Sequence, residues 1–187
     1  MINIAILSSH NGSGFTAIYK AKLKKILDID IKVVISNNTD AVVLENATKY
    51  GIDNFLVNSK TDEDPDKKII KLLEEYECEY IFLSGYMKKL SPKITQNYKV
   101  INSHPSLLPK YGGIGMYGRL VHESVIENRE RVSGVTIHEV NEIYDSGKII
   151  LQKELTLSTN ETAQTLETKI KDLEQKAIVE GLKICLN

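Results

Sequence analysis

Apolar and polar residues form alternating blocks along the chain that predict strands and helices in turn. The run Ile2–Leu7 is almost continuously apolar, which is typical of a strand buried on both faces. Similar runs predict strands over 31–36, 54–57, 79–83 and 98–101. Helices are expected between them, over 15–27, from about 41 to 50, and to about 76 with the acidic residues 61–66 in the first turn. Strand–helix alternation of this kind favours a parallel sheet with right-handed crossovers.

The pattern changes in the second half of the chain. A short helix is expected over 120–127, and two alternating segments, 135–140 and 148–155, predict a hairpin. Apolar residues at helical spacing then predict a long amphipathic helix over 162–186. We therefore expect an α/β fold with a Rossmann-like, mostly parallel sheet, helices on both faces, and a C-terminal hairpin plus long helix. No linker or repeat interrupts the chain, so we expect a single domain over residues 1–187.

Charge and composition exclude several classes of partner. The 24 basic and 25 acidic residues leave a net charge of -1, so we expect no binding to nucleic acid or to an anionic membrane surface. No apolar run approaches the ~18 residues of a membrane span. Cys78 and Cys185 are isolated, which favours reduced thiols and no metal site. The acidic segment 61–66 suits a helix N-terminus better than a metal site, because nothing nearby supplies other ligands. We expect a cytoplasmic protein without a targeting signal.

The segment from Asn102 to Pro109 carries the clearest chemistry. Its two prolines cannot donate ladder hydrogen bonds, so the strand before it is predicted to stop, with Asn102, Ser103 and His104 on a rigid loop. In parallel sheets, ligands bind beyond the carboxyl ends of strands. A lone histidine more often fills a turn, but Asn102 and a downstream Asp145-Ser146-Gly147 favour a catalytic role for His104.

Two glycine-containing loops are further candidates. The loop 8–14 joins a strand to a helix, so its amides favour an anion. Its sequence is neither a P-loop nor a dinucleotide-binding fingerprint, and an ordinary tight turn without a ligand is the alternative interpretation. The segment Gly112–Gly118 predicts a mobile flap or a close approach of backbone to ligand.

The motif Asn102-x-His104-Pro105-Ser106-Leu107-Leu108-Pro109, followed by Asp145-x-Gly147, resembles the folate-dependent formyltransferases and hydrolases. Within that family the chain is most similar to the glycinamide ribonucleotide transformylases of purine synthesis. The resemblance continues through Asn11-Gly12-Ser13, the segment 85–92, Leu151-Gln152 and Glu174. It implies formyl transfer from 10-formyltetrahydrofolate, a co-substrate, to the amine of glycinamide ribonucleotide, with no metal.

The resemblance also implies roles for individual residues. Asn102 would donate a hydrogen bond to the oxyanion, His104 would stabilise charge and move protons, and Asp145 would lie near that histidine. The ribonucleotide would be bound by Gly12, Ser13, Gly14 and Glu174. The folate would be bound by Met87, Lys88, Lys89, Leu90, Asn102, Asn141, Glu142, Ile143, Tyr144 and Asp145. The partners implied are these small molecules alone, with the protein as a monomer or homodimer.

The chain departs from the family pattern at a few positions. Gly14 stands where the family usually has Asn, and Asp62 replaces a basic residue. The Gly112–Gly118 loop differs from the shorter, histidine-bearing loop of many members, and His122 is a candidate to replace that imidazole. His138 matches a family histidine on the hairpin strand, and for both histidines we favour a structural role over catalysis.

Other functions fit the same motif. They are hydrolysis of 10-formyltetrahydrofolate, formylation of methionyl-tRNA or of a sugar nucleotide, and a regulator that binds without turnover. The related deformylases carry an extra N-terminal module and the tRNA enzymes an extra C-terminal domain, neither of which we expect here.

Overall fold

The computed structural model describes residues 1–186, and their contacts group into two compact units, the first from Met1 to Ile101 and the second from Asn102 onward. Seven strands form one sheet in the order β3-β2-β1-β4-β5-β6-β7. Strand β5, Lys99–His104, contributes residues to both units. The single domain predicted over residues 1–187 stays a prediction.

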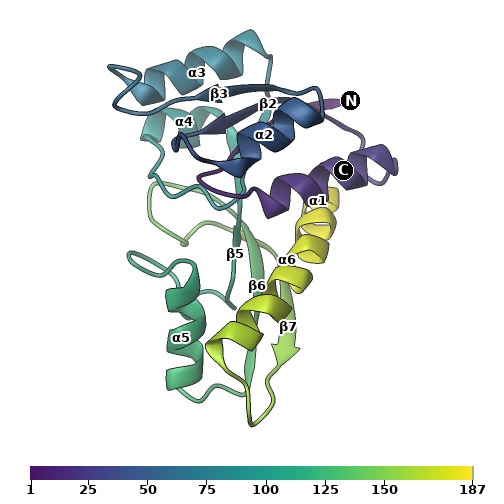
Figure 1. Cartoon of the computed structure of the whole chain (residues 1–187), viewed down its shortest axis with the longest axis vertical. Coiled ribbons are helices and arrows are strands. Elements are labelled where there is room, and N and C mark those ends of the chain that lie inside the picture. The colour runs from purple at the N-terminus through teal and green to yellow at the C-terminus, as the bar shows by residue number, and fades with distance from the viewer. Residues whose placement is uncertain (187) are drawn as a thin grey trace. The chain divides into compact units, whose positions relative to one another are not determined.

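The first unit is a parallel α/β layer around β1. Its strands are β1 (Ile2–Leu7), β2 (Ile29–Ser36), β3 (Asp53–Leu56) and β4 (Tyr80–Leu83), and β1 pairs in parallel with both β2 and β4. Its helices are α1 (Ser13–Leu23), α2 (Val42–Lys49), α3 (Pro65–Glu75) and α4 (Pro92–Asn97). The strand order reverses between β1 and β4, so right-handed crossovers place α3 on the opposite face from α1 and α2 (Figure 1). Helices on both faces are thus confirmed.

Most predicted elements are found within a few residues of their expected ends. Helix α2 ends where predicted, because Gly51 follows its cap at φ 69°. Helix α3 begins where Asp64 accepts a hydrogen bond from the Lys67 amide (3.0 Å). The short helix α4 was missed by the apolar pattern, although Ser91-Pro92 is a typical helix start.

One prediction about the central motif was wrong. Asn102, Ser103 and His104 do not leave the strand on a loop, because β5 continues through His104. The strand ends only at Pro105, the first residue of the motif without an N–H group. The three polar side chains therefore take their directions from a strand.

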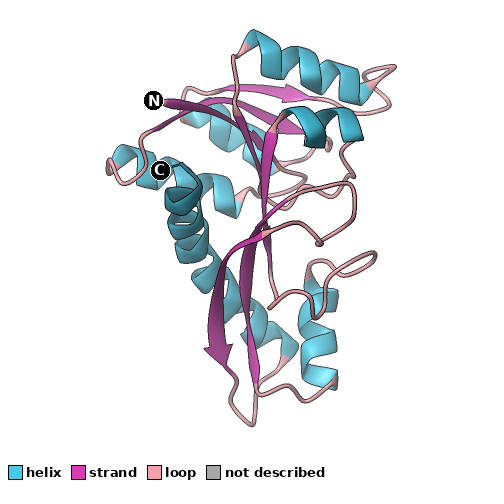
Figure 2. Cartoon of the chain, turned by 180° about the vertical axis from the view of Figure 1, so that it is seen from behind, coloured by secondary structure: helices cyan, strands magenta, loops and turns pink. Residues whose placement is uncertain are grey.

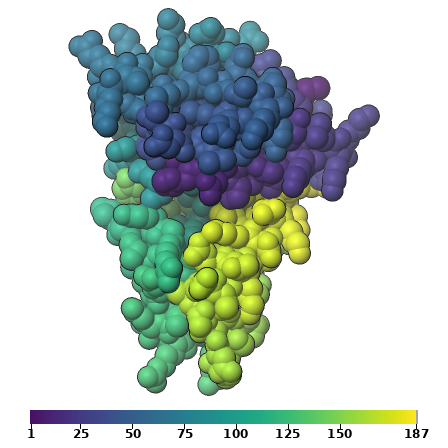
Figure 3. Space-filling model, in the orientation of Figure 1, coloured from purple at the N-terminus to yellow at the C-terminus, as the bar shows by residue number. Residues whose placement is uncertain are grey.

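The second unit contains the predicted hairpin and long helix. It comprises the end of β5, α5 (Arg119–Glu127), β6 (Val132–Glu139), β7 (Ile149–Thr156) and α6 (Ala163–Leu186). Strands β6 and β7 pair antiparallel and appear as neighbouring magenta arrows in Figure 2. Gly181 of α6 lies against the side chain of Ile137 of β6, where a Cβ would have no room. In Figure 3 the green surface of α5 and the yellow-green surface of α6 adjoin, in agreement with their contacts.

None of the helices within residues 1–186 combines the length and the apolar character needed to cross a bilayer.

Candidate active site

Strand β5 presents its polar side chains to two different faces. Side chains alternate along a strand, so Asn102 and His104 share one face and Ser103 points to the other. The contacts agree with this alternation. Asn102 meets His138 of β6, and His104 meets Asp145, whereas the Ser103 hydroxyl donates to Glu174 of α6 at 2.5 Å.

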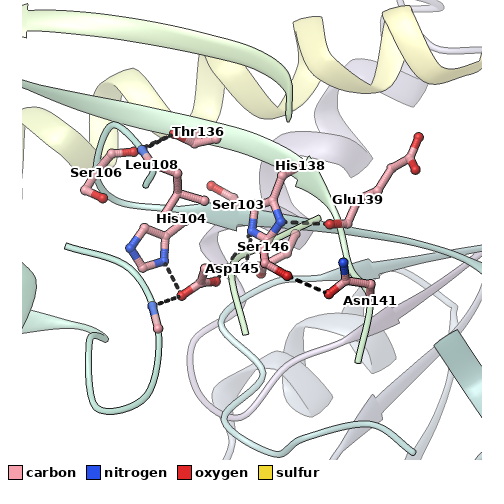
Figure 4. Close-up of polar contacts among 12 residues, drawn as sticks. Ser103, His104, Ser106, Leu108, Thr136, His138, Glu139, Asn141, Asp145 and Ser146 are labelled. Atoms are coloured by element: carbon pink, nitrogen blue, oxygen red, sulfur yellow. Dashed lines mark hydrogen bonds and ion pairs between the residues drawn. The ribbon is translucent and has the colours of Figure 1, made fainter. Parts of the chain in front are cut away.

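The loop after β5 is held by a buried threonine. Thr136 of β6 is fully buried, and its hydroxyl donates to the Ser106 carbonyl (2.7 Å) and accepts from the Leu108 amide (3.0 Å), as Figure 4 shows in part. Gln152 of β7 donates to the Leu108 carbonyl and to the Thr136 hydroxyl, both at 2.9 Å. Gly134, on the same face of β6 as Thr136, leaves room for the side chain of Leu107. The hairpin therefore shapes the backbone that follows His104.

The carboxylate of Asp145 reaches the site from the loop between β6 and β7. Asp145 has a φ of 53°. Two residues later, Gly147 lies so close to the Glu139 carbonyl that a Cβ at this position would overlap it. Asn141 stabilises this loop, because its Oδ1 accepts from the Ile143 amide (2.9 Å) and the Ser146 hydroxyl (3.0 Å). The Asn141 side chain thus supports the loop, whereas Ile143 and Tyr144 are exposed.

Both ring nitrogens of His104 face acceptors. Its Nε2 lies 2.7 Å from the Tyr111 carbonyl, and its Nδ1 lies 3.6 Å from Asp145 Oδ2. The same Oδ2 accepts from the Gly113 amide at 2.8 Å. A neutral imidazole has one N–H donor and an imidazolium has two, so this geometry can accommodate a positively charged ring. The ring is buried, with 5% of its side-chain surface exposed.

His138 links Asn102 to the same carboxylate. Its Nδ1 lies 2.8 Å from the Glu139 carbonyl, and its Nε2 lies 3.1 Å from Asn102 Nδ2 and 3.6 Å from Asp145 Oδ1. Burial lowers the pKa of His138, outweighing the opposing effects of the Glu139 carbonyl and of Asp145. A neutral ring that donates through Nδ1 accepts through Nε2, so one amide hydrogen of Asn102 is directed to His138 and the other stays available.

Glu174 and His122 belong to the helices of this unit. Desolvation raises the pKa of Glu174, although the Ser103 hydroxyl and Lys171 both act to lower it. His122 of α5 is buried and its Nδ1 has no hydrogen-bond partner within residues 1–186, and burial lowers its pKa. His138 is therefore part of the polar cluster around Asp145, whereas His122 Nδ1 makes no hydrogen bond to that cluster.

The predicted anion loop lies in the first unit. Gly12 has a φ of 64° and packs against Val43, where a Cβ would clash. Helix α1 starts directly after it at Ser13, with no side-chain cap and no acidic residue in its first turn. The Phe15 amide of the first turn donates to the Ser84 hydroxyl at 3.2 Å. Amides at a helix N-terminus favour an anion, and the anion site at Gly12, Ser13 and Gly14 stays a prediction.

The segment Met87–Leu90 also lies in the first unit. The Met87 amide donates to the hydroxyl of Ser9 (2.7 Å), which is buried and in turn donates to Asn37 (2.5 Å). Leu90 is buried. The Met87 amide is therefore already paired, and a ligand would have to use other groups of this segment.

Sequence reasoning missed several contributors to the His104 surroundings. They are Thr136, the carbonyl of Tyr111 and the amide of Gly113. Two of them are main-chain groups, which leave no signal in a single sequence. The part of the chain that the structure describes contains no group of three or more His, Cys, Asp and Glu residues placed to hold a metal ion.

Comparisons with known proteins point in one direction. Residues 2–182 match a family model described as formyl transferase. The chain is similar to a phosphoribosylglycinamide formyltransferase of Bacillus subtilis, with 34% identity over 94% of this chain and 90% of that protein. A chloroplastic enzyme of the same name from Vigna unguiculata is 33% identical over 95% of this chain. The chain spans 58% of the length of that relative and 63% of a second chloroplastic one.

A solved structure shows the same likeness. The crystal structure of phosphoribosylglycinamide formyltransferase from Bacillus halodurans superposes with a TM-score of 0.90 at 29% sequence identity. It covers 99% of this chain and 95% of its own.

Proposed function

Because the chain belongs to the formyl transferase family, we propose that it transfers the formyl group of 10-formyltetrahydrofolate to the amine of glycinamide ribonucleotide. The relatives described above carry the name of this activity. The observation that carries the proposal is a buried His104 whose two nitrogens face the Tyr111 carbonyl and Asp145, beside an amide hydrogen of Asn102 that has no acceptor within residues 1–186.

The reaction exchanges one carbon–nitrogen bond for another. The substrate amine attacks the formyl carbon, and the electron pair of the carbonyl moves to oxygen. The oxyanion then collapses and the bond to N10 of the folate breaks, so the amine loses one proton and N10 gains one. The free hydrogen of Asn102 Nδ2 is suited to donate to the oxyanion. One such donor lowers the barrier by roughly 3–4 kcal/mol.

His104 and Asp145 supply charge and proton transfer in this proposal. A protonated His104, whose Nδ1 lies 3.6 Å from Asp145 Oδ2 as an ion pair, places positive charge beside the oxyanion. The carboxylate stabilises that charge in a setting where only 12% of its side-chain surface is exposed. Help of this kind with proton transfer contributes about a hundredfold or more to the rate.

Binding roles follow the predictions made from the sequence. We assign the ribonucleotide phosphate to the amides of Gly12, Ser13 and Gly14, because they lie at the N-terminus of α1 with no acidic residue in its first turn. We assign sugar hydroxyls to the carboxylate of Glu174. The folate is assigned to the segments 87–90 and 141–145, with the Met87 amide excepted because Ser9 already accepts from it.

An assay with purified protein tests the function directly. Tetrahydrofolate formation is followed with 10-formyltetrahydrofolate in the presence and absence of glycinamide ribonucleotide, and with a sugar-nucleotide amine in its place. Turnover that requires the ribonucleotide supports the proposal. Turnover without any acceptor would instead identify a hydrolase, and binding without turnover a regulator.

The same preparation tests assembly. We propose that the protein works on small molecules alone, as a monomer or homodimer. Sedimentation analysis with and without substrates distinguishes these two states from larger assemblies.

A further inference from the structure

Tyr111 touches the catalytic histidine through its backbone and a distant carboxylate through its side chain. Its carbonyl lies 2.7 Å from His104 Nε2, and its hydroxyl donates to Glu130 Oε1 at 2.9 Å. Its φ is 55°, a conformation that residues with a Cβ rarely adopt. A residue held there requires surrounding contacts that favour the conformation.

Glu130 supplies those contacts from the turn between α5 and β6. Its Oε1 accepts hydrogen bonds from the Tyr111 hydroxyl and from Lys110 Nζ, both at 2.9 Å. Hydrogen bonds from Lys110 and Tyr111 lower the pKa of Glu130, so its carboxylate is ionised at neutral pH. One carboxylate thus ties down two consecutive residues of the segment that follows the Asn102–Pro109 motif.

A pocket of about 270 Å³ that is partly open to solvent borders this segment, lined by Leu107, Lys110, Tyr111, Val125, Glu130 and Ser133 among others. The backbone just before Tyr111 is held by the buried Ser106, whose hydroxyl donates to the Lys110 carbonyl at 2.7 Å. The bond to Glu130 is the hydrogen bond made by the Tyr111 side chain, so we expect the Tyr111 carbonyl to shift when that bond is lost.

The same short segment also reaches Asp145. Gly112 lies where a Cβ would crowd the side chains of Leu108 and Asp145, and the Gly113 amide then donates to Asp145 Oδ2 at 2.8 Å. A shift of Tyr111 would be passed to Gly113, two residues along. The segment thus orients both partners of the His104–Asp145 pair.

We propose that Glu130 and the hydroxyl of Tyr111 are positioning groups for His104. They hold the Tyr111 carbonyl against Nε2, which keeps the Nε2 proton in place and Nδ1 directed to Asp145. Without them the ring can rotate about its Cβ–Cγ bond, and the charge it carries is misplaced relative to the oxyanion. This inference rests on the proposed function for its kinetic consequence, but the orientation of the ring can be measured without any substrate.

The kinetic test uses Tyr111→Phe and Glu130→Ala. Each should lower kcat by about tenfold to a hundredfold, as small misplacements of reacting groups do, with KM for both substrates changed less than twofold. The double variant should be no slower than the worse single variant, because both substitutions remove the same hydrogen bond between Tyr111 and Glu130. Glu130→Gln keeps an acceptor for the hydroxyl and should recover most of the rate. Tyr76→Phe is the matched control, since it removes a tyrosine–carboxylate hydrogen bond of 2.8 Å to Asp53 in the first unit.

The structural test uses protein labelled with ¹⁵N in its histidine rings. The ring of His104 should show a proton on Nε2 in the wild type and in Tyr76→Phe, and a mixture of tautomers or exchange broadening in Tyr111→Phe. Wild-type ring signals in Tyr111→Phe and Glu130→Ala would overturn the proposal, as would a loss of affinity with unchanged kcat. If the wild type turns over no substrate, the proposed function fails while the ring signals still decide the positioning role.

Discussion

The carboxylate of Asp145 faces the imidazole of His104, with Oδ2 3.6 Å from Nδ1 and both side chains largely buried. The two residues come from different elements, the end of β5 and the loop between β6 and β7. A charge so close and so little exposed to water interacts strongly with its neighbour. The pair is therefore the first target for mutation.

Replacement of His104 by Ala should reduce turnover by about a hundredfold to ten-thousandfold, since the variant loses the group assigned to proton transfer. The measurement is kcat with both substrates saturating. The circular dichroism spectrum should stay that of the wild type. A His104→Ala protein with ordinary activity would contradict the mechanism.

Replacement of Asp145 by Asn should lower kcat by about tenfold to a hundredfold. The amide keeps the size of the side chain but removes the charge that stabilises a protonated His104. Asp172→Asn, an exposed change on α6, is the control, and equal behaviour of the two variants would argue against a special role for Asp145.

Acid should destabilise the protein through His138. Burial lowers the pKa of His138 in the folded state, so the unfolded chain binds the proton first as pH falls below about 6.5. The free energy of unfolding should therefore decrease as the pH falls below that value. The decrease is at most about 1.4 kcal/mol for each pH unit, and it ends once the pH is below the folded-state pKa of His138. Urea unfolding at pH 7.5 and pH 5.5 measures the difference. His138→Gln keeps an acceptor for Asn102 and should show a smaller difference, and an unchanged one would rule out His138 as the source.

Glu174→Gln should separate stability from binding. Desolvation raises the pKa of Glu174, so its charged form is unfavourable in the fold and a neutral isostere should raise the melting temperature. Loss of the charge should raise KM for glycinamide ribonucleotide about tenfold or more, because hydrogen bonds to a charged group are worth roughly 1.5–3 kcal/mol. Glu180→Gln is the control, since that carboxylate is half exposed in its pair with Lys153. A variant with lower stability and unchanged KM would contradict both expectations.

Gly12→Ala should damage both the fold and ribonucleotide binding. The new Cβ meets a φ of 64° and the side chain of Val43 at once. Gly51→Ala is the matched control, because Gly51 has a φ of 69° and nothing within 4 Å of a Cβ. We expect Gly51→Ala to cost about 1–2 kcal/mol from the backbone alone, and Gly12→Ala to cost more and to raise KM for the ribonucleotide. An equal loss of unfolding free energy in Gly12→Ala and Gly51→Ala, measured with urea, would show that the Val43 side chain moves aside at little cost.

The fold was predictable from the sequence where local pattern and burial agree. Strand β1 has apolar residues on both faces because both of its neighbours are strands in a covered sheet, and its bounds were found directly. Strand β5 was cut short in the prediction, because Asn, Ser and His have little strand preference of their own. Pairing within the sheet overrides that preference, and only Pro105 stops the strand.

The candidate site divides in the same way. Asn102, His104 and Asp145 were found from their side chains and spacing, and the structure brings them into one cluster with His138. Thr136 was not predicted as part of the site, because the alternating pattern of a strand does not indicate which loop a strand residue will hydrogen-bond.

The sequence by itself determined the order of the strands and of every helix except α4, and the glycines that tight backbone requires, while its resemblance to a known family indicated the residues expected to carry out formyl transfer. These depend on local periodicity and on the chemistry of single side chains. Only the tertiary structure decided that His104 Nε2 meets the carbonyl of Tyr111, that Glu130 holds Tyr111, and that Asn102 shares its amide with His138. Such contacts join residues from separate elements, partly through main-chain groups that every residue has, so they exist only once the chain is folded.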